Sequence, residues 1–275
     1  MNRRNFLHFM GCGCLAISMN SCATTPITDR KQLKLISDSK LNAQAAQIYE
    51  KVKEKEKKKL INDSRLSKIQ EIGKKMEESI SEYFYQSNIP DPTTNFDWEY
   101  ILIDRKKVKN AWCMPGGKIA FYSGILPVCK NDDGIAAVMG HEIAHAFARH
   151  TVEKLTQSSM MQMATIGISN SKYADMLNKS FTIGNVSGNV YDSVVKFGIF
   201  LPFSRTMESE ADYLGMGFMN LSGFDIKEPA KLWLRMMEGK AGGIPEFMSS
   251  HPNPDNRSNK FLEWENEIID KFPRV

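Results

Sequence analysis

The residues of this sequence best suited to do chemistry are two histidines on either side of a glutamate. His141-Glu142-Ile143-Ala144-His145 lies in a segment whose pattern predicts a helix. Four residues turn a helix by about 400°, so the two imidazoles share one face and can bind one metal ion. Glu142 lies about 100° round the helix, beside the metal, where a base for a metal-bound water belongs. With five histidines in 275 residues, chance does not readily produce this motif.

A catalytic zinc usually has three protein ligands and one open position for water, so a third ligand is expected elsewhere. His150 lies nine residues from His141, about 900° along the helix, and faces away while that helix continues. Downstream, the segment SRTMESEADYLGM (204–216) predicts a helix on which Glu208 and Asp212 share a face. We expect Glu208 to bind the metal and Asp212 to hold the N–H of a ligating imidazole. The alternative for this segment is a solvated acidic helix.

Helices must position these residues, with a small sheet beside them. Apolar residues at helical spacing predict the helices, and Pro115-Gly116-Gly117 predicts a turn between two strands. The expected strands lie within 97–104 and 109–124, and the expected helices are 39–60, 64–85, 132–157, 205–221, 227–238 and 258–271. This order is typical of an α+β fold that is mainly helical, with one small sheet next to the helix of the histidine motif.

Residues 158–204 differ in composition from the rest of the chain. They are rich in Met, Gly, Ser and Asn, and their most apolar stretches are about ten residues long, too short to cross a bilayer. Because the segment is inserted between the two helices that carry the expected metal ligands, we predict a mobile cover or plug over the site. The alternative is ordinary core and loop.

The amino end resembles the signal peptide of a bacterial lipoprotein. Two arginines precede an apolar stretch that ends shortly before Cys22. We therefore expect residues 1–21 to be removed, Cys22 to carry the lipid, and residues 22–38 to form a tether. Cys12 and Cys14 are rival lipidation sites. The paired arginines leave both the general and the twin-arginine export routes open.

Composition excludes several classes of protein. Lys and Arg number 36 against 32 Asp and Glu, and a net charge of +4 is too small to indicate nucleic-acid binding. No apolar run approaches the roughly 18 residues of a membrane-spanning helix, which excludes a polytopic membrane protein. Hydrophobic residues make up 42% of the chain and charged residues 25%, which is ordinary for a folded globular protein.

Cys113 and Cys129 are the cysteines of the expected folded part. In an oxidising compartment they could form a disulfide, but sequence alone does not place their Cα atoms within bonding range. Free thiols in the core are the more common outcome for two such residues.

Four ordered motifs resemble the HtpX-like and CAAX-prenyl-protease family of zinc metallopeptidases. They are NAWCMPGGKIAFYSGIL (110–126), HEIAHAFARH (141–150), SRTMESEAD (204–212) and SHPNPDNR (250–257). The resemblance covers about residues 30–265 and looks closest to a single-domain lipoprotein branch related to a mitochondrial stress metalloendopeptidase. TPITDRKQL (25–33) is similar to the mature start of that branch, with Asp29 where glycine is usual.

The resemblance implies a zincin-like metallopeptidase domain of the gluzincin type over residues 39–275, with one Zn²⁺ per chain. Its zinc ligands are His141, His145 and Glu208, and Glu142 is its catalytic base. The zinc would lower the pKa of a bound water towards about 7, and Glu142 would take the proton so that hydroxide attacks a peptide carbonyl.

The loop SHPNPDNR contributes two further residues. Without the resemblance, His251 is readily explained as an exposed loop histidine. The resemblance places it at the zinc, where its imidazole stabilises the oxyanion or occupies the open metal position. Arg257 is expected nearby, as the partner of an ion pair rather than as a catalyst.

The resemblance also implies an endopeptidase that acts on unfolded or misassembled cell-envelope proteins. Lipid attachment would hold the enzyme to a membrane in the periplasm, and Ala23 after Cys22 favours the outer membrane over the inner. We expect the substrate to pair by main-chain hydrogen bonds along an edge strand made of Lys118, Ile119, Ala120, Phe121 and Tyr122. Such pairing requires an unfolded segment and little side-chain identity.

A function from another class stays open. The chain could be a zinc-stabilised periplasmic chaperone or assembly lipoprotein that holds its clients without hydrolysing them. Glu142 favours the enzyme, because a purely structural metal site needs ligands but no base.

Overall fold

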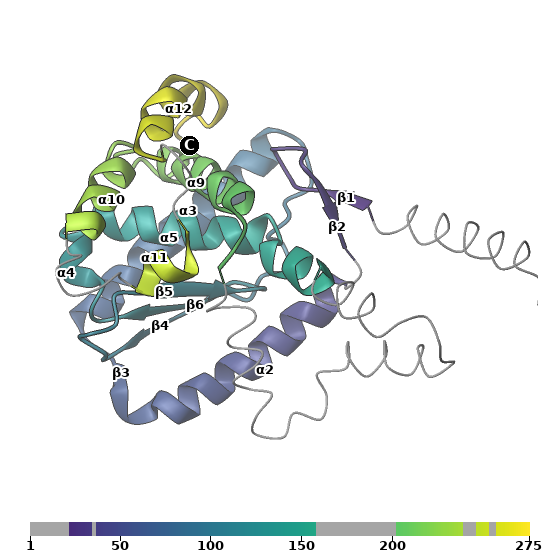
Figure 1. Cartoon of the computed structure of the whole chain (residues 1–275). Helices are drawn as coiled ribbons and strands as arrows, with labels where there is room; N and C mark the ends of the chain where they lie inside the picture. Colours follow the sequence, from purple (N-terminus) through teal and green to yellow (C-terminus); the bar gives the residue numbers. More distant parts are fainter. Residues whose placement is uncertain (1–21, 35–36, 158–201, 239–245, 253–256) are drawn as a thin grey trace, which may run out of the picture.

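The computed structural model describes residues 22–34, 37–157, 202–238, 246–252 and 257–275. The expected signal peptide, residues 1–21, and almost all of the expected cover, residues 158–204, lie outside the described residues. Figure 1 shows a small sheet between layers of helices. The described chain is mainly helical, which confirms the expected α+β class.

The main sheet of the described chain has four strands in the order β3, β4, β6, β5. β4 and β6 run parallel, whereas β5 and β6 form an antiparallel hairpin. Gly116 and Gly117 form the hairpin turn with φ of +83° and +80°, a backbone conformation that residues with a Cβ rarely adopt. The strand bounds are β3 Leu60–Ile61, β4 Glu99–Ile103, β5 Ala111–Met114 and β6 Lys118–Tyr122.

The strand that was expected at the edge lies in the interior of this sheet. β6, which carries Lys118–Tyr122, pairs with β4 on one side and with β5 on the other. Among the described residues β5 pairs only with β6, so Ala111–Met114 is an edge strand, and β3 forms the opposite edge. The expectation was wrong because interior and edge strands have the same apolar pattern when both faces of a sheet are buried.

Helices cover both faces of the sheet (Figure 1). α2 (Asp38–Glu56) packs on one face in a buried cluster that includes Ile101 of β4. On the other face, α3 (Ser64–Gln86) and α5 (Asp132–Phe147) belong to a larger cluster that includes the next residue, Leu102. Successive side chains of a strand point to opposite faces, so β4 contributes to two cores.

The other helices of the described chain pack beyond α5 or connect the larger elements. The helices expected at 205–221, 227–238 and 258–271 are confirmed within one residue at each end. The bounds are η1 Lys57–Lys59, α4 Leu126–Cys129, α9 Arg205–Leu221, α10 Glu228–Glu238, α11 Glu246–Ser250 and α12 Arg257–Lys271.

α5 and α9 cross at two glycines. A Cβ added to Gly140 would lie 2.8 Å from the carbonyl oxygen of Gly215, and one added to Gly215 would lie 2.9 Å from the backbone N of His141. The two backbones therefore touch, because neither residue has a side chain between them. This contact brings the first histidine of the motif close to Glu208 on α9.

α5 is shorter than expected. It begins at the N-cap Asn131, whose side chain accepts a hydrogen bond from the N–H of Gly134 at 2.9 Å, and it ends at Phe147. Arg149 then adopts a φ of +57°, and helical structure resumes only at His150. The expectation of one helix over 132–157 was wrong, because the break contains neither glycine nor proline to signal it.

The first described residues form a second, two-stranded sheet. β1 (Cys22–Thr24) pairs antiparallel with β2 (Lys31–Leu33), with Cys22 opposite Leu33. The loop between them has positive φ at Ile27 and at Asp29, the position where glycine is usual in the resembling branch. The side chains of this loop bond to α9, so these residues belong to the folded domain. Over residues 22–33 this corrects the tether that was expected at 22–38.

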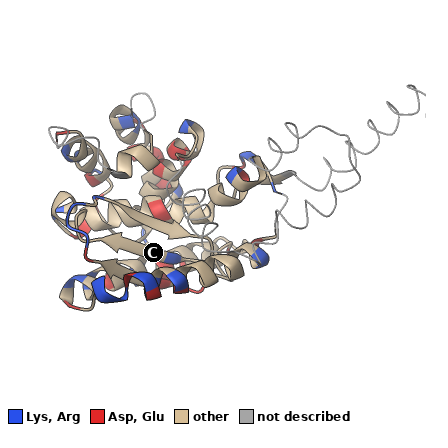
Figure 2. Cartoon of the chain, turned by 60° about the horizontal axis from the view of Figure 1, so that its bottom comes forward, with Lys and Arg blue, Asp and Glu red and all other residues tan. Residues whose placement is uncertain are grey.

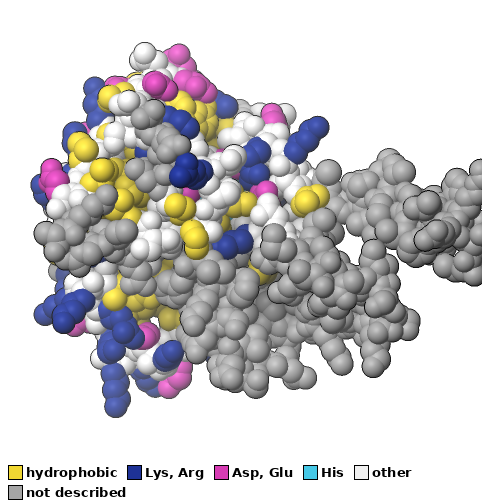
Figure 3. Space-filling view, viewed as in Figure 1, with side chains coloured by type: hydrophobic (Ala, Val, Ile, Leu, Met, Phe, Trp, Pro, Cys, Tyr) yellow, Lys and Arg dark blue, Asp and Glu magenta, His cyan; other side chains and the backbone are white. Residues whose placement is uncertain are grey.

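Charged side chains lie on the outside of the described chain. In Figure 2 the outer face of α2 carries acidic and basic residues side by side, and the lysine-rich run at 51–59 is largely exposed, as expected for a solvated helix face. Basic and acidic side chains are also interspersed over the face shown in Figure 3. No helix within the described ranges is both long enough and apolar enough to span a bilayer.

Cys113 on β5 and Cys129 on α4 are both free thiols, and both are buried. Burial raises the pKa of each thiol, that of Cys129 to about 12. They are therefore unpaired core residues, the more common of the two outcomes expected from sequence.

Candidate metal centre

Three elements bring four candidate metal ligands together. α5 supplies His141 and His145, α9 supplies Glu208, and His251 directly follows α11. Their donor atoms all lie within 4.8 Å of one another, and all four side chains are buried. The loop histidine is thus at the metal cluster rather than exposed to solvent.

The distances between the donor atoms are close to those of a tetrahedral metal site, although three of the five are slightly shorter. His141 Nε2 lies 3.0 Å from His145 Nε2 and 3.4 Å from Glu208 Oε2, and His145 Nε2 lies 3.5 Å from Glu208 Oε1. His251 Nδ1 lies 3.1 Å from Glu208 Oε1 and 3.2 Å from His141 Nε2. Bonds of about 2.0 to 2.2 Å in tetrahedral geometry separate neighbouring ligand atoms by roughly 3.3 to 3.6 Å.

The hydrogen bonds on the far sides of the two imidazoles point to the same conclusion. His141 Nδ1 lies 3.0 Å from Asp212 Oδ1, and His145 Nδ1 lies 2.8 Å from His150 Nδ1. When each ring carries its proton on Nδ1, the lone pairs of the two Nε2 atoms face and repel each other. A cation between the two atoms removes this repulsion. Glu208 Oε2 is buried and accepts no hydrogen bond from the described residues, so it too can bind a cation.

The electrostatics of the cluster favour the metal-binding forms of His145 and Glu208. Burial lowers the pKa of His145 well below its ordinary value, which keeps that imidazole neutral. Burial alone would raise the pKa of Glu208, but His251 and His145 hold it well below its ordinary value. For His141, burial opposes a charge, yet the hydrogen bond to Asp212 and the nearby carboxylate of Glu208 raise the pKa to about 9. The carboxylates therefore stabilise a positive charge at this point, as a metal ion would supply.

Glu142 lies beside the cluster and outside the set of candidate ligands. Its Oε2 accepts a hydrogen bond from the N–H of Cys113 on β5 at 3.2 Å, and its Oε1 lies 3.3 Å from His251 Nε2. Burial raises the pKa of this carboxyl group. Glu142 thus lies between the edge strand and the metal cluster, where it can accept a proton.

Arg257, at the start of α12, is fully enclosed at the back of the cluster. Its guanidinium bonds to Asp212, approaches Glu208 Oε2 at 3.7 Å, and lies 3.4 Å above the ring of Trp233. Its charge offsets the two buried carboxylates, as expected for an ion-pair partner. The structure thus brings Asp212 and Arg257 to the positions expected from the sequence.

Sequence reasoning missed the role of His150 and Glu210. His150 was expected to face away, but the break after α5 turns it back so that it contacts His145. Its other nitrogen, Nε2, lies 2.9 Å from Glu210 Oε2 on α9. The spacing of Glu208 and Glu210, about 200° apart on a helix, gave no sign that both face buried histidines.

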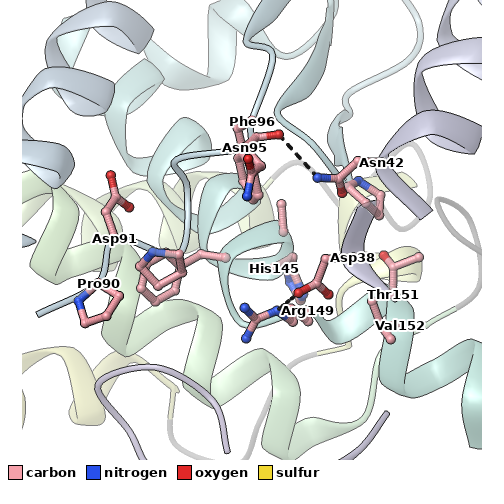
Figure 4. Close-up of a pocket in the computed structure, with 14 residues that line it drawn as sticks. Asp38, Asn42, Pro90, Asp91, Asn95, Phe96, His145, Arg149, Thr151 and Val152 are labelled. Carbon is pink, nitrogen blue, oxygen red and sulfur yellow. Dashed lines mark hydrogen bonds and ion pairs between the residues drawn. The ribbon is translucent and has the colours of Figure 1, made fainter. Parts of the chain in front are cut away.

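A pocket of about 290 Å³ adjoins the site, and its lining includes His145, Pro115 and Arg149. In Figure 4 the side chains of Asp38 and Arg149 point toward one another, and Arg149 Nε lies 3.0 Å from Asp38 Oδ2. Pro115 directly follows β5, so the pocket lies at one end of the edge strand. A peptide that paired with β5 would run toward it.

Comparisons with known proteins agree with this geometry. Mitochondrial metalloendopeptidase OMA1 of Schizosaccharomyces pombe is 38% identical over 173 residues, which are 62% of this chain and 48% of the relative. OMA1 of Saccharomyces cerevisiae is 34% identical over 63% of this chain and 50% of the relative. The beta-barrel assembly-enhancing protease of Yersinia pestis is 24% identical over 58% of this chain and 33% of the relative. The chain thus spans half or less of the length of these relatives.

The family model that matches this chain covers most of its described core. It is described as Peptidase family M48 and matches residues 70–265, a range that contains His141, His145, Glu208 and His251. Because the match extends over more than half of the 275 residues and includes every candidate ligand, the chain belongs to peptidase family M48.

Proposed function

We propose that this protein is a zinc-dependent endopeptidase that hydrolyses peptide bonds in unfolded or misassembled proteins. The single observation that carries the proposal is the position of Glu142. Its carboxylate lies between a buried His, His, Glu donor set and the edge of β5 that pairs with no other described strand, to which it is hydrogen-bonded at Cys113. A structural metal site needs no such base.

Each residue has a distinct part in the proposed reaction. A divalent cation, for which zinc is typical with two imidazoles and a carboxylate, would polarise the attacking water and the peptide carbonyl when bound. His141, His145 and Glu208 would hold it. Glu142 would take the proton from the water and deliver it to the leaving amine, a transfer that its raised pKa favours.

The substrate would add as a further strand to β5. The N–H of Cys113 points to Glu142 and not to β6, so this residue faces the free edge, and Ala111, two residues earlier, faces the same way. The N–H of Cys113 now donates to Glu142, and that of Ala111 donates to Asn110 Oδ1 at 2.9 Å, so a peptide that paired here would have to replace these contacts or use the carbonyl groups. Its main-chain hydrogen bonds would not depend on its side chains. This favours extended, unfolded segments as substrates.

His251 occupies the fourth corner of the donor set. With His251 Nδ1 among the ligands, all four donors would come from the protein, and no coordination position would be left for the attacking water. We take this arrangement as a resting form in which His251 must withdraw before hydrolysis. Once withdrawn, its imidazole would be close enough to stabilise the oxyanion.

The proposed place of action is the cell envelope, with the chain anchored by a lipid on Cys22 to the periplasmic side of the outer membrane. The lipoprotein-like amino end supports this, and the name of the Yersinia pestis relative, which refers to beta-barrel assembly, is consistent with action in a cell envelope. Incorporation of a labelled fatty acid into the wild-type protein, and its loss in Cys22→Ser, would test the anchor. Label in both proteins would contradict it.

Comparison of the wild type with Glu142→Gln tests the peptidase activity. The substitution keeps the shape of the side chain and removes the base, so we expect about one zinc per chain in both proteins. Cleavage of casein should fall by about 10²-fold or more in the variant, because general-base catalysis contributes about that much. Arg65→Gln, on the exposed start of α3, is a control that should keep full activity.

The same experiment distinguishes the rival function. If both proteins bind zinc and neither cleaves any unfolded protein, the proposal fails and a zinc-stabilised chaperone becomes the better explanation. Suppression of aggregation by the inactive variant would support that explanation directly.

A further inference from the structure

The loop between β1 and β2 reaches a carboxylate beside the metal cluster. Glu210 Oε1 accepts hydrogen bonds from Thr28 and from Thr25, whose hydroxyl oxygen lies 2.7 Å away. Glu210 Oε2 accepts one from Arg30 Nε at 2.5 Å. These donors come from residues about 180 positions earlier in the chain, so the contacts depend on the tertiary fold.

The same carboxylate bonds to His150, which in turn contacts a candidate metal ligand. Glu210 Oε2 lies 2.9 Å from His150 Nε2, and His150 Nδ1 lies 2.8 Å from His145 Nδ1. All three side chains are at least nine-tenths buried, so solvent does not compete for these bonds. A continuous chain of hydrogen bonds thus runs from the amino-terminal loop to His145.

The chain of bonds sets the tautomer of each ring. An ionised Glu210 accepts only, so His150 Nε2 must carry a proton, and its Nδ1 then presents a lone pair. That lone pair accepts the proton on His145 Nδ1, which leaves His145 Nε2 free to bind a cation. Every N–H donor in this series of hydrogen bonds then meets an acceptor, and His145 Nε2 faces the metal site.

Arg30 holds the far end of this chain in place. While its Nε bonds to Glu210, its NH1 and NH2 groups lie 3.2 and 2.8 Å from the two carboxylate oxygens of Glu153. Glu153 lies on the helical segment that starts at His150. A single guanidinium therefore ties the amino-terminal loop both to α9 and to the segment that carries His150.

We propose that Arg30, with Thr25 and Thr28, positions the metal ligand His145 by acting through Glu210 and His150. The hairpin that follows Cys22 is then a working part of the metal site, not only a connection to the membrane. The inference rests on the metal site of the proposed function, but it concerns the affinity and geometry of metal binding rather than the reaction.

Metal affinity of the full-length protein tests the inference directly. Zn²⁺ is titrated against a chromophoric chelator in Arg30→Ala, Glu210→Gln, the double variant, Arg30→Lys and Lys31→Ala. Loss of an outer partner of a metal-bound histidine typically lowers affinity about 10- to 100-fold. We expect a loss in this range for Glu210→Gln and a loss near its lower end for Arg30→Ala. Arg30→Lys should have an intermediate Zn²⁺ affinity, because lysine keeps the positive charge but lacks the planar guanidinium that bonds to two carboxylates.

Two results would show that Arg30 acts through Glu210 and not on the fold at large. The double variant should bind Zn²⁺ as weakly as Glu210→Gln alone, because coupled residues are not additive. The visible absorption of bound Co²⁺ should shift at saturation, which a loss of stability alone would not cause. Lys31→Ala removes an exposed charge next to Arg30 and should bind like the wild type.

Wild-type affinity and an unchanged Co²⁺ spectrum in Arg30→Ala would overturn the inference, as would losses that add in the double variant. If Arg30→Ala does not fold, Thr25→Val decides the question, since it removes one buried donor to Glu210 with little change of shape. Reduced affinity supports the inference and wild-type affinity overturns it. A wild type that binds Zn²⁺ but cleaves nothing would overturn the peptidase proposal alone.

Discussion

Four of the five histidines of the chain lie in one buried cluster. Burial makes a protonated imidazole costly, so such a cluster is stable only when carboxylates, neighbouring rings or a cation satisfy its nitrogens. Here Asp212, Glu210 and Glu208 provide the acceptors, and each comes from α9. One helix thus determines the orientation of the histidines that α5 and the segment after it supply.

Asp212→Asn should weaken metal binding, and it should also lower stability because Arg257 loses its charged partner. The amide keeps the shape of the carboxylate but loses the charge that orients His141 Nδ1–H, so we expect Zn²⁺ affinity to fall by about 10- to 100-fold. Competition with a chelator measures the effect, and Asp270→Asn on the exposed side of α12 is the control. Equal affinity in both variants would contradict the role of Asp212.

Lys154 should make the stability of the metal-free protein rise at alkaline pH. Burial lowers its pKa to about 8, although its Nζ lies 4.5 Å from the centre of the Phe203 ring, which favours the charged form. Between pH 8 and 10.5 the unfolded chain keeps a proton that the folded chain has lost, so stability increases with pH.

Lys154→Met should abolish this rise and be more stable than the wild type at pH 7. Urea unfolding of both metal-free proteins at pH 7 and pH 9.5 measures the difference. The comparison between the two proteins matters, because other groups titrate in the same range. Parallel pH profiles would show that Lys154 is not held with a lowered pKa.

At the scale of elements, the crossing of α5 and α9 determines how the candidate metal ligands on these two helices lie relative to each other. Gly140→Ala would place a Cβ against the backbone of Gly215, which cannot move without shifting a helix. We expect a loss of about 1 to 3 kcal/mol in the free energy of unfolding. We also expect weaker Zn²⁺ binding, because His141 and Glu208 lie on the two helices that must separate.

Gly73→Ala is the matched control for this prediction. Its Cβ would meet the ring of Tyr100, at the contact of α3 with β4, and so would destabilise the fold away from the ligand-bearing helices. Zn²⁺ affinity should fall in Gly140→Ala and not in Gly73→Ala. Equal affinity in the two variants would mean that the crossing does not position the ligands.

The two histidines on α5 and most helices could be predicted from the sequence because their spacing is local, whereas the place of His251 at the metal cluster was implied only by the family resemblance. His141 and His145, and likewise Glu208 and Asp212, are four residues apart, and helical geometry alone places each pair on one face. His150 was misjudged for the same reason, since the argument assumed a helix that in fact breaks at Arg149. No glycine or proline marks that break, so only the tertiary contacts reveal it.

Strand order and the role of the amino-terminal hairpin depend on contacts between distant residues. Lys118–Tyr122 reads as an apolar strand whether it lies inside the sheet or at its edge, and only the pairing with β4 settles its position. Thr25 and Arg30 are small and charged residues in a polar stretch, which is typical of a linker. Their partner, Glu210, is identified only when α9 is packed beside them.

At the scale of the whole molecule, the site lies where the larger of two cores meets the edge of the sheet. α2 and the sheet form one core, and α3, α5, α9 and α12 form the other with the opposite sheet face. The metal cluster is buried among helices of the second core, yet Glu142 reaches β5. In the proposed reaction, the ligands would stay rigid while the strand edge receives a substrate.

Metal binding should be linked to the stability of the whole fold. Without a cation, Glu142, Glu208 and Asp212 remain as closely spaced buried carboxyl groups, which the neighbouring histidines, Arg257 and Lys154 offset in part. A cation that binds only the folded state stabilises it by about 2.7 kcal/mol at a free concentration 100 times its Kd. For a protein of this size, that corresponds to a Tm increase of roughly 5 to 10 °C.

We therefore expect the Tm of the wild type to fall when a chelator removes the metal and to rise with the logarithm of free Zn²⁺ above its Kd. Glu208→Gln removes one ligand and keeps its shape, so its Tm should hardly respond over the same range. Scanning calorimetry at buffered Zn²⁺ concentrations gives both values. A wild-type Tm that stays constant from below the Kd to 100 times above it would mean that the cluster binds folded and unfolded chains equally. A site assembled from α5, α9 and the residue after α11 exists only in the folded chain, so this result would contradict the metal site.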